Sequence, residues 1–318
     1  VIGAVSGESY ADYLREHVFT PLAMKHTFAS EPEAMRNGLA TGHQVWFGVP
    51  VDADTYRSDY IAAGWLTSSV GDMGNYLIAQ LNGGIYAGRS VLSAQGIEEM
   101  HRGVSKVGTG GSYGMGWLAD SLNGVPVVSH DGDALNMNSD MVLVPSLSWA
   151  VELVATSDSL PVLLSASVTS TVKGVVSMLM GLKAPFTASP LVTYIVFDLL
   201  VLAFLGFQVW SLVRAVGRSQ RPWRSRWASI LRRAALPLGW RLVVATALIG
   251  LLWLLAAQLG ASPLLIVNTD LGVSIVTIAV LLLVNGAVRT ARAYIAAQSV
   301  TTLAEPLAPS SAAPWSRR

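Results

Sequence analysis

The sequence predicts an α+β domain, in which helices flank an antiparallel sheet, followed by three transmembrane α-helices. Residues 113–155 divide into short β-branched and apolar runs separated by turn residues, the pattern of an antiparallel meander. Beyond residue 190 the chain contains three apolar runs close to the roughly 20 residues that cross a bilayer. We therefore expect a domain at 1–183, a membrane region at 184–298 and a disordered cytoplasmic tail at 299–318.

Helices are expected before and after the meander. Ser9-x-x-Asp12 and Ser69-x-x-Asp72 both resemble capping boxes, in which the first side chain accepts a hydrogen bond from the backbone three residues on. Apolar residues within 165–182 recur at helical spacing and predict a helix after the last strand.

The stretch 125–144 organises the meander. Asn123-Gly124 is a strong signal for a two-residue hairpin turn, and β-branched residues follow it. His130 then lies near a predicted strand end, followed by Asp131, Gly132 and Asp133. A histidine beside a glycine that lets another molecule approach the backbone is a candidate reactive position. The alternative is a polar turn with a solvated histidine.

Composition separates the two halves of the chain. The sequence has no cysteine, so disulfides, a thiol nucleophile and thiolate metal sites are excluded. Residues 1–190 hold 9 Lys and Arg against 17 Asp and Glu, a net charge of −8, and the remainder holds 12 Arg against 3 acids, a net charge of +9. This asymmetry points to a membrane or an anionic partner for the second half. Because Val1 opens the chain without an initiator Met or signal peptide, we expect a fragment or processed chain.

The predicted spans are 191–213, 242–261 and 271–288. The Arg-rich loop 214–241 contains no acid, and the positive-inside rule places it and the C-terminus in the cytoplasm. Three spans then put residues 1–190 outside a cell membrane that the chain crosses several times. The expected partner of this half is the lipid bilayer. We do not expect nucleic acid, because a juxtamembrane basic loop is more often a topology signal that also meets anionic lipid.

Two polar residues interrupt the apolar runs. Asp198 lies in the first span and Asn285 in the third. Such groups are functional candidates inside a membrane. We favour a position near the outer water for Asp198 and a helix–helix hydrogen bond for Asn285.

Four blocks of residues 1–180 occur in a recognisable order. They are residues 7–24, ending in Thr20-Pro21-Leu22-Ala23-Met24, residues 62–73, with Ala63-Gly64-Trp65-Leu66-Thr67-Ser68, Tyr113-Gly-Met-Gly-Trp117, and His130-x-Gly132. In this order they resemble the serine β-lactamase and penicillin-binding-protein-like hydrolases, in their broad β-lactamase-related branch.

The resemblance implies acyl transfer through a serine ester, without a cofactor. The family's nucleophile lies in a Ser-x-x-Lys motif, and a second acid/base lies in a Tyr-x-Asn motif. A third motif, Lys or His followed by any residue and then Gly, faces the serine. His130 takes this last catalytic position, with Asp131, Gly132 and Asp133 beside the substrate and the N–H of Asp133 as an oxyanion donor. Asp131 replaces a common Thr or Ser, so we expect it to repel the carboxylate of a β-lactam. An ester, amide or amine-bearing peptide is then the expected substrate.

Other matches to catalytic patterns are expected to be coincidental. Ser170-Thr-Val-Lys173 fits Ser-x-x-Lys but follows the His motif, and no Tyr-x-Asn occurs. Gly110-Gly-Ser112-Tyr-Gly114 fits the nucleophile elbow but lacks the strand before and the helix after that the elbow requires. The other histidines show no metal-ligand spacing with one another, and we assign no metal.

The sequence thus predicts the C-terminal part of a membrane-anchored serine hydrolase that lacks its Ser-x-x-Lys nucleophile and is inactive alone. The alternative is a non-catalytic extracytoplasmic binding or sensor module on the same fold. An intact upstream Ser-x-x-Lys and Tyr would favour the enzyme.

Overall fold

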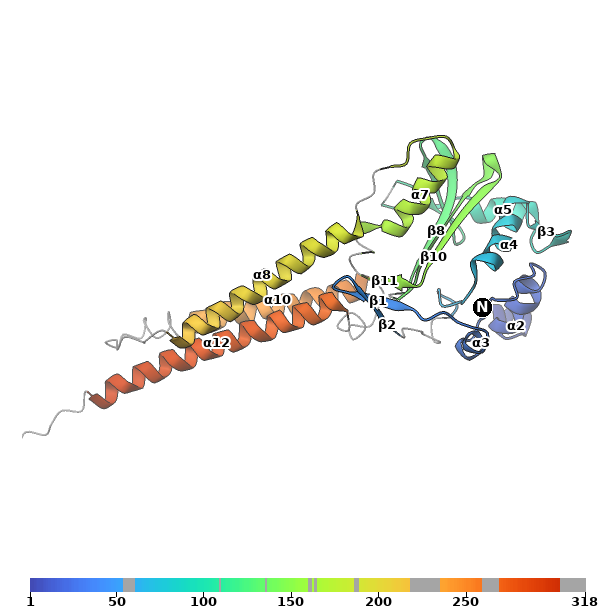
Figure 1. The fold of residues 1–318 in the computed structure, drawn as a ribbon. Helices are drawn as coiled ribbons and strands as arrows, with labels where there is room; N and C mark the ends of the chain where they lie inside the picture. Colours follow the sequence, from blue (N-terminus) through green and yellow to red (C-terminus); the bar gives the residue numbers. More distant parts are fainter. Residues whose placement is uncertain are drawn as a thin grey trace, which may run out of the picture. The chain divides into compact units, whose positions relative to one another are not determined.

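The computed structural model describes residues 1–53, 61–108, 110–134, 136–159, 162, 165–185, 189–217, 235–258 and 269–303. The chain forms two compact units, Val1–Val196 and Phe197–Arg318 (Figure 1). The first unit combines helices with β-sheet, and the described part of the second is helical.

The main sheet of the first unit has six antiparallel strands in the order β10-β9-β8-β7-β6-β5. Their bounds are β5 Ser105–Lys106, β6 Ser112–Tyr113, β7 Leu118–Leu122, β8 Val125–Asp133, β9 Asn138–Val144 and β10 Trp149–Ala155. Asn123 and Gly124 both adopt positive φ, 52° and 82°, which is the requirement of a tight hairpin turn whose twist matches its strands. The predicted antiparallel meander is confirmed.

The first unit also contains two smaller sheets. The first has the order β11-β1-β2, with β1 His43–Trp46, β2 Val49–Asp52 and β11 Ser157–Asp158. Here β11 runs parallel to β1, so the end of the meander is tied back to the first fifty residues. The second is the short hairpin of β3 Ile85–Tyr86 and β4 Arg89–Ser90.

The helices of the first unit are α1 Ile2–Ser6, α2 Tyr10–Leu14 with a π-helical continuation at Arg15–Phe19, α3 Glu31–Arg36, α4 Val70–Leu81, α5 Ala94–His101 and α7 Ser167–Leu179. Both predicted capping boxes form. The Ser9 hydroxyl accepts from the Asp12 N–H at 3.1 Å, and the Ser69 hydroxyl accepts from the Asp72 N–H at 3.2 Å. Each bond satisfies one of the N–H groups that a helix start leaves without an intrahelical acceptor.

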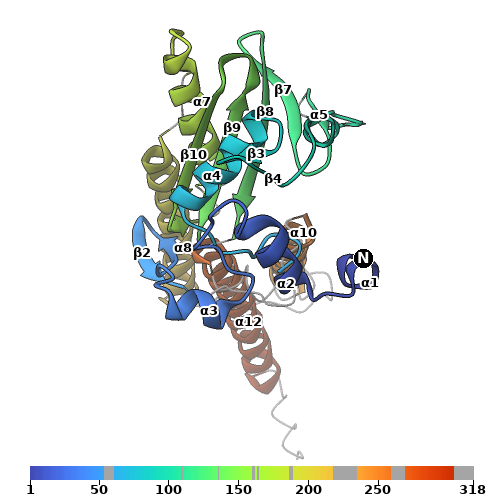
Figure 2. The same ribbon diagram turned by 90° about the vertical axis from the view of Figure 1, so that its right-hand side faces the viewer.

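The helices α7 and α4 lie on opposite faces of the main sheet (Figures 1 and 2). Side-chain alternation along β8 and β9 divides the core between these two faces. One face packs on α7 through Val127, Val142, Val144, Val172 and Val176. The other face packs on α4 through Val128, Leu143, Trp117 and Leu77. Consecutive residues such as Val127 and Val128 therefore bury into different layers.

Asp72 joins the start of α4 to the preceding loop. Its buried carboxylate accepts from the His26 N–H at 2.6 Å and from the Thr27 hydroxyl at 2.7 Å. Thr27 also shares a 2.8 Å hydrogen bond with Ser68. Asp72 thus donates its backbone N–H to the cap at the start of α4, and its carboxylate clamps this helix to the preceding loop.

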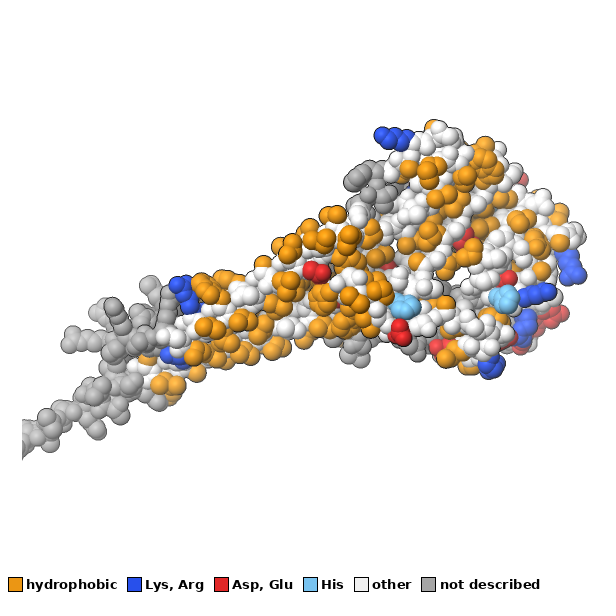
Figure 3. Space-filling model, in the orientation of Figure 1, with side chains coloured by type: hydrophobic (Ala, Val, Ile, Leu, Met, Phe, Trp, Pro, Cys, Tyr) orange, Lys and Arg blue, Asp and Glu red, His pale blue; other side chains and the backbone are white. Residues whose placement is uncertain are grey.

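The second unit contains the rest of α8 Pro190–Gly217, together with α10 Leu236–Gln258 and α12 Asp270–Leu303. Among the described residues, α8 and the Asp270–Ala296 part of α12 are long and apolar enough to cross a membrane, by length and composition. The Leu238–Leu254 part of α10 is a shorter apolar helix. The space-filling view shows apolar side chains along the surface of these helices (Figure 3).

The structure changes some of the sequence predictions for the second half of the chain, and others concern residues that the structure does not describe. Two of the three predicted spans meet the length and composition required, and the third, 242–261, coincides with α10 up to residue 258. Because α12 runs to Leu303, the first residues of the expected tail are helical. Residues 218–234 of the predicted basic loop and 304–318 of the tail lie outside the described residues.

Asn285 makes the helix–helix contact that its sequence position suggested. It is 1% exposed, and its amide donates to the backbone carbonyl of Gln208 at 3.0 Å and to the Gln208 side chain at 3.2 Å. The bond joins α12 to α8. The predicted interhelical hydrogen bond is confirmed.

Substitution of Asp72 tests the clamp. Asp72→Ala leaves the buried donors of His26 and Thr27 without their acceptor, so we expect the free energy of unfolding to fall by about 3 kcal/mol. Asp12→Ala is the matched control, because Asp12 holds the same helix position on an exposed surface and should cost only about 0.5 kcal/mol. Urea titration of the full chain in detergent, followed by circular dichroism, measures both. Equal losses for the two variants would contradict the clamp.

Candidate active site

His130 lies on a part of β8 that has a strand on one side. The ladder between β8 and β9 continues to Asp133, opposite Asn138. The ladder between β7 and β8 ends at Leu118 opposite Ser129. In the part of the chain that the structure describes, no strand pairs with the second edge of residues 130–133. This edge is therefore available to an extended ligand.

Two hydrogen bonds orient the His130 ring. Its Nδ1 lies 2.6 Å from the carbonyl oxygen of Asp131, and its Nε2 lies 2.9 Å from the hydroxyl of Tyr113. Because a carbonyl can only accept, Nδ1 carries the proton, and in the neutral ring Nε2 accepts from the Tyr113 O–H. These two bonds fix the His130 ring in the tautomer that carries its proton on Nδ1, with the Tyr113 hydroxyl on Nε2.

The sequence interpretation missed the role of Tyr113. This residue lies within one of the blocks used for the family resemblance, but periodicity gives no sign of its partner, seventeen residues later. The two rings meet edge to face, with centroids 5.9 Å apart. The hairpin geometry of β6, β7 and β8 brings them together.

The four predicted site residues divide between the two faces of the sheet. His130 is paired with Met141, which packs beside Trp117, whereas Asp131 is paired with the buried Asp140. Asp131 and Asp133 line a small pocket of about 70 Å³ against the first turn of α7. The side chains of Asp131 and Asp133 are thus separated from that of His130.

This division bears on the expected repulsion between Asp131 and the carboxylate of a β-lactam, which depends on where the Asp131 side chain lies. Since Asp131 points toward α7, the structure gives no support to excluding β-lactams on this ground. A Cβ at Gly132 would lie 2.6 Å from the Ser139 hydroxyl, so a larger residue here would require the Ser139 side chain to move.

Buried carboxyl groups gather behind the strand. Burial raises the pKa of Asp140 to about 6, and the nearby Asp131 carboxylate adds to the effect while a hydrogen bond from Thr169 opposes it. Burial and the neighbouring Asp133 carboxyl raise the pKa of Asp158, which is 1% exposed. Ionisation of these groups is disfavoured because a low-dielectric interior penalises charge.

Glu152 of β10 is a further carboxyl group with a raised pKa, and it lies on the same face of the sheet as His130. It is opposite Met141, and burial raises its pKa to about 7. The row His130, Met141 and Glu152 crosses three strands, so the carboxyl is about 10 Å from the histidine along the sheet. It contributes to the electrostatics of this face without touching the ring.

The two other catalytic patterns, which the sequence analysis interprets as coincidental, lie on α7 and on β6. Ser170 and Lys173 lie on α7, which covers the face opposite His130. Ser112 lies in β6 and is followed by a turn and β7, so the helix that a nucleophile elbow needs is not there.

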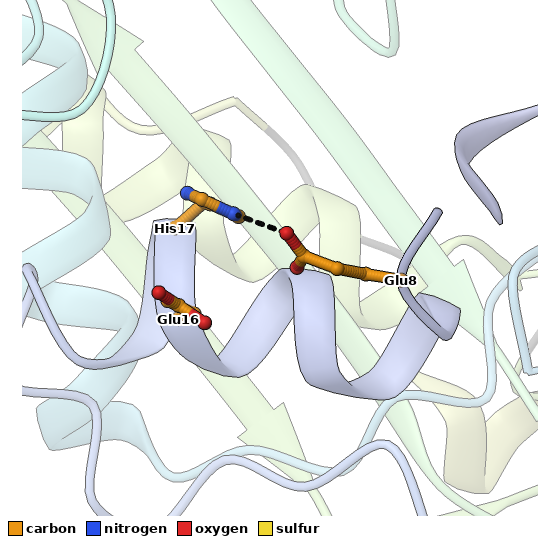
Figure 4. Close-up of side chains that lie close together, drawn as sticks. All are labelled: Glu8, Glu16 and His17. Carbon is orange, nitrogen blue, oxygen red and sulfur yellow. Dashed lines mark hydrogen bonds and ion pairs between the residues drawn. The ribbon is translucent and has the colours of Figure 1, made fainter. Parts of the chain in front are cut away.

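Glu8, Glu16 and His17 form the one group of carboxylate and imidazole side chains, among the described residues, that could share a metal ion (Figure 4). Their nearest ligand atoms lie within 4.8 Å of one another. His17 Nε2 pairs with a Glu8 carboxylate oxygen at 3.3 Å, and Glu16 and His17 are exposed. A surface ion pair explains this geometry, and we assign no metal to it.

Comparison with known families agrees with this architecture. Residues 1–165 match the model of the family described as Beta-lactamase. The chain belongs to the β-lactamase family. The match covers β8 and β9 with His130, and it ends just before α7.

Individual relatives cover part of the chain. Penicillin-binding protein 4 of Amycolatopsis lactamdurans is 28% identical over 164 residues, 46% of this chain and 41% of the relative. The unguisins hydrolase of Aspergillus campestris is 27% identical over 161 residues, 48% of this chain and 30% of the relative. The chain thus spans less than half the length of the curated relatives it matches.

A solved structure shares the fold of this β-lactamase-family chain. The octameric penicillin-binding protein homologue from Pyrococcus abyssi aligns with a TM-score of 0.50 and 23% sequence identity. The alignment covers 57% of this chain and 40% of that one.

The pKa of Asp140 makes stability depend on pH. A carboxyl group whose pKa rises from about 3.9 in the unfolded chain to about 6 in the fold destabilises the protein as pH rises through this window. Asp140→Asn removes the ionisation. We expect it to gain up to about 3 kcal/mol over wild type between pH 4 and pH 7, with no further change above.

Thermal unfolding at a series of pH values measures this gain. Glu98→Gln is the matched control, because Glu98 is an exposed carboxylate on α5. A difference between Asp140→Asn and wild type that is the same at pH 4 and pH 7 would show that Asp140 does not titrate in this range.

Proposed function

We propose that this chain supplies the sheet side of the active site of a membrane-anchored serine hydrolase. The observation that carries the proposal is the edge of β8 at residues 130–132, with which no described strand pairs, beside the hydrogen-bonded pair of His130 and Tyr113. An extended substrate can add to this edge through its backbone, as an extra strand. Family membership supports acyl transfer as the chemistry.

His130 and Tyr113 divide the proton chemistry between them. The neutral imidazole accepts at Nε2, and the Tyr113 hydroxyl can pass a proton to it or receive one from it. The pair stands next to Gly132, where the absence of a side chain lets a substrate carbonyl approach the strand. The N–H of Asp133 remains our predicted oxyanion donor.

The nucleophile is proposed to come from another segment of a longer protein. Residues 1–165 contain no Ser-x-x-Lys, and the matched relatives are more than twice as long as their aligned part. This chain alone is then inactive. The proposed substrate is an ester, an amide or a peptide, and one relative is named as a hydrolase.

The second unit is proposed to anchor the enzyme. α8 and α12 have the length and apolar composition of spans, and we propose that α10 is the third. The arginines then place the loop 214–241 and the C-terminus in the cytoplasm and residues 1–190 outside the cell membrane.

Activity-based labelling tests the proposed chemistry. The full-length protein in membranes should react with a fluorophosphonate or a fluorescent penicillin, and His130→Ala should abolish the reaction. Tyr113→Phe removes only the hydroxyl on Nε2 and should slow labelling by about tenfold.

His26→Ala is the control for these variants, since it changes an exposed histidine in the same unit. If the folded full-length protein is not labelled, the serine hydrolase is excluded and the non-catalytic binding or sensor module takes its place. Equal labelling of wild type and His130→Ala would remove His130 from the mechanism.

The absence of cysteine allows a direct test of topology. Glu98→Cys should react with a membrane-impermeant maleimide on intact cells, because α5 belongs to the proposed outer domain. Gly217→Cys, at the end of α8, should react only after the membrane is permeabilised. The opposite pattern would invert the topology, and labelling of both on intact cells would contradict the anchor.

A further inference from the structure

The hairpin of β1 and β2 in the first unit exposes apolar side chains. Its strands pair Trp46 with Val49 and Gln44 with Val51, so these four side chains share one face of the hairpin. Val49 and Val51 are 61% and 45% exposed, and Phe47, the first residue of the turn, is 44% exposed. Phe47, Val49 and Val51 together form the hairpin patch.

Phe47 occupies a turn position that disfavours a bulky residue. Phe47 and Gly48 have φ values of 48° and 79°, close to the 52° and 82° of Asn123 and Gly124 in the β7–β8 hairpin. Two-residue hairpin turns with positive φ at both positions prefer Asn-Gly, and an aromatic residue is strained there. Turn geometry therefore does not explain the ring of Phe47, and backbone strain of this kind is typical of functional positions.

Tyr194 bonds this hairpin to the first turns of α8, within the same unit. The Tyr194 side chain is 5% exposed, and its hydroxyl donates to the carbonyl of Val45 at 3.4 Å. The same hydroxyl shares a hydrogen bond with Ser159, which directly follows β11, the parallel neighbour of β1. The small sheet is thus joined to the start of the first apolar helix two residues before Phe47.

The length of α8 gives the level of this contact in a membrane. α8 has 28 residues. At 1.5 Å per residue it is about 42 Å long, which matches the roughly 40–45 Å of a bilayer with its headgroups. Tyr194 is the fifth residue of α8, so it lies in the headgroup region of a membrane that this helix crosses. The hairpin bonded to Tyr194 is then at the membrane surface.

We propose that the hairpin patch inserts into the outer leaflet of the membrane, as a lipid contact of the first unit beside α8. Insertion removes exposed apolar area from water, and Trp46, on the same face as Val49, has the side chain that is enriched at this depth. The proposal rests on the proposed membrane placement of α8. It goes beyond anchoring, because it gives the outer domain a lipid contact of its own.

Addition of another strand is the rival use of this hairpin. No described strand pairs with the outer side of β2, and all four residues of β2 are exposed. However, Pro50 has no N–H to donate, and proline is typical of edges that are protected from pairing. The segment from Val45 to Val51 contains no charged residue, and the ion pair of His43 with Asp52 lies at the end away from the turn. An uncharged apolar tip favours lipid.

Fluorescence quenching by lipids tests the insertion, and the chain has no cysteine to interfere. Phe47→Cys in the full chain carries an NBD fluorophore, and single chains are reconstituted in phosphatidylcholine nanodiscs. We expect blue-shifted emission and a loss of about half of the signal to lipids with a nitroxide at the headgroup boundary, where interfacial side chains lie. Emission typical of water, without quenching, would overturn the proposal.

Asn123→Cys is the matched control, because Asn123 is exposed and has the same turn conformation as Phe47. It precedes β8, whose other end leads to Asn136, the residue whose carbonyl accepts from the His43 N–H. The nine residues of β8 separate these ends by about 30 Å. A label at Asn123→Cys should emit as in water. Equal quenching at both positions would overturn the proposal, because partitioning of the dye itself would explain the result.

A label beside the turn tests the ring of Phe47 itself. The labelled Val49→Cys variant should be quenched by the same lipids. Adding Phe47→Asn should lower this quenching by about half, because the ring is lost while Asn suits the turn and keeps the hairpin folded. Adding Phe47→Trp should leave it unchanged. Equal quenching with Phe, Asn and Trp at this position would contradict insertion through the ring.

A third labelled position separates failure of the inference from failure of the anchor. Leu202 is 64% exposed and lies twelve residues after the start of α8. A label at Leu202→Cys should be quenched by nitroxides deep in the acyl chains, and its absence would reject the anchor together with the hairpin contact. Quenching at Leu202→Cys without quenching at Phe47→Cys would reject the hairpin contact alone. Blue-shifted emission at Phe47→Cys without lipid quenching would show a protein surface over the hairpin and would also reject it.

Discussion

The unequal length of the two ladders on β8 is the constraint on which the candidate site depends. The ladder between β7 and β8 ends at Leu118 opposite Ser129, and the ladder between β8 and β9 continues to Asp133 opposite Asn138. Residues 130–133 are therefore paired with β9 on one side, and no described strand pairs with their other side. A strand paired on both sides would have no room for a ligand, and an unpaired loop would have no fixed geometry.

The same strand separates two electrostatic environments a few ångströms apart. Alternation directs His130 toward the face of Trp117 and directs Asp131 and Asp133 toward α7. Burial raises the pKa of Asp158 to about 8, so this carboxyl group is mostly neutral at pH 7, whereas Asp140, with a pKa of about 6, is mostly ionised there. Strand alternation thus separates the His130 face from acids that lie beside it in the sequence.

In the second unit, polar side chains are buried between long apolar helices and need partners within the protein. Asn285 bonds to Gln208, and Arg289 bonds to Asn285 and Ser211, so the polar side chains are satisfied by one another across α8 and α12. These bonds fix the register of the two helices.

Periodicity and local chemistry determined the elements: the turn at Asn123-Gly124, the two capping boxes, the strands of the meander and the apolar helices follow from interactions between residues close in sequence. Motif order also identified the family and the position of His130. The pairing of His130 with Tyr113, the turning of Asp131 away from it and the bonds of Arg289 to Ser211 across two helices were decided by the tertiary structure. Each depends on strand register or helix packing between distant segments, and no local sequence pattern encodes where such segments meet.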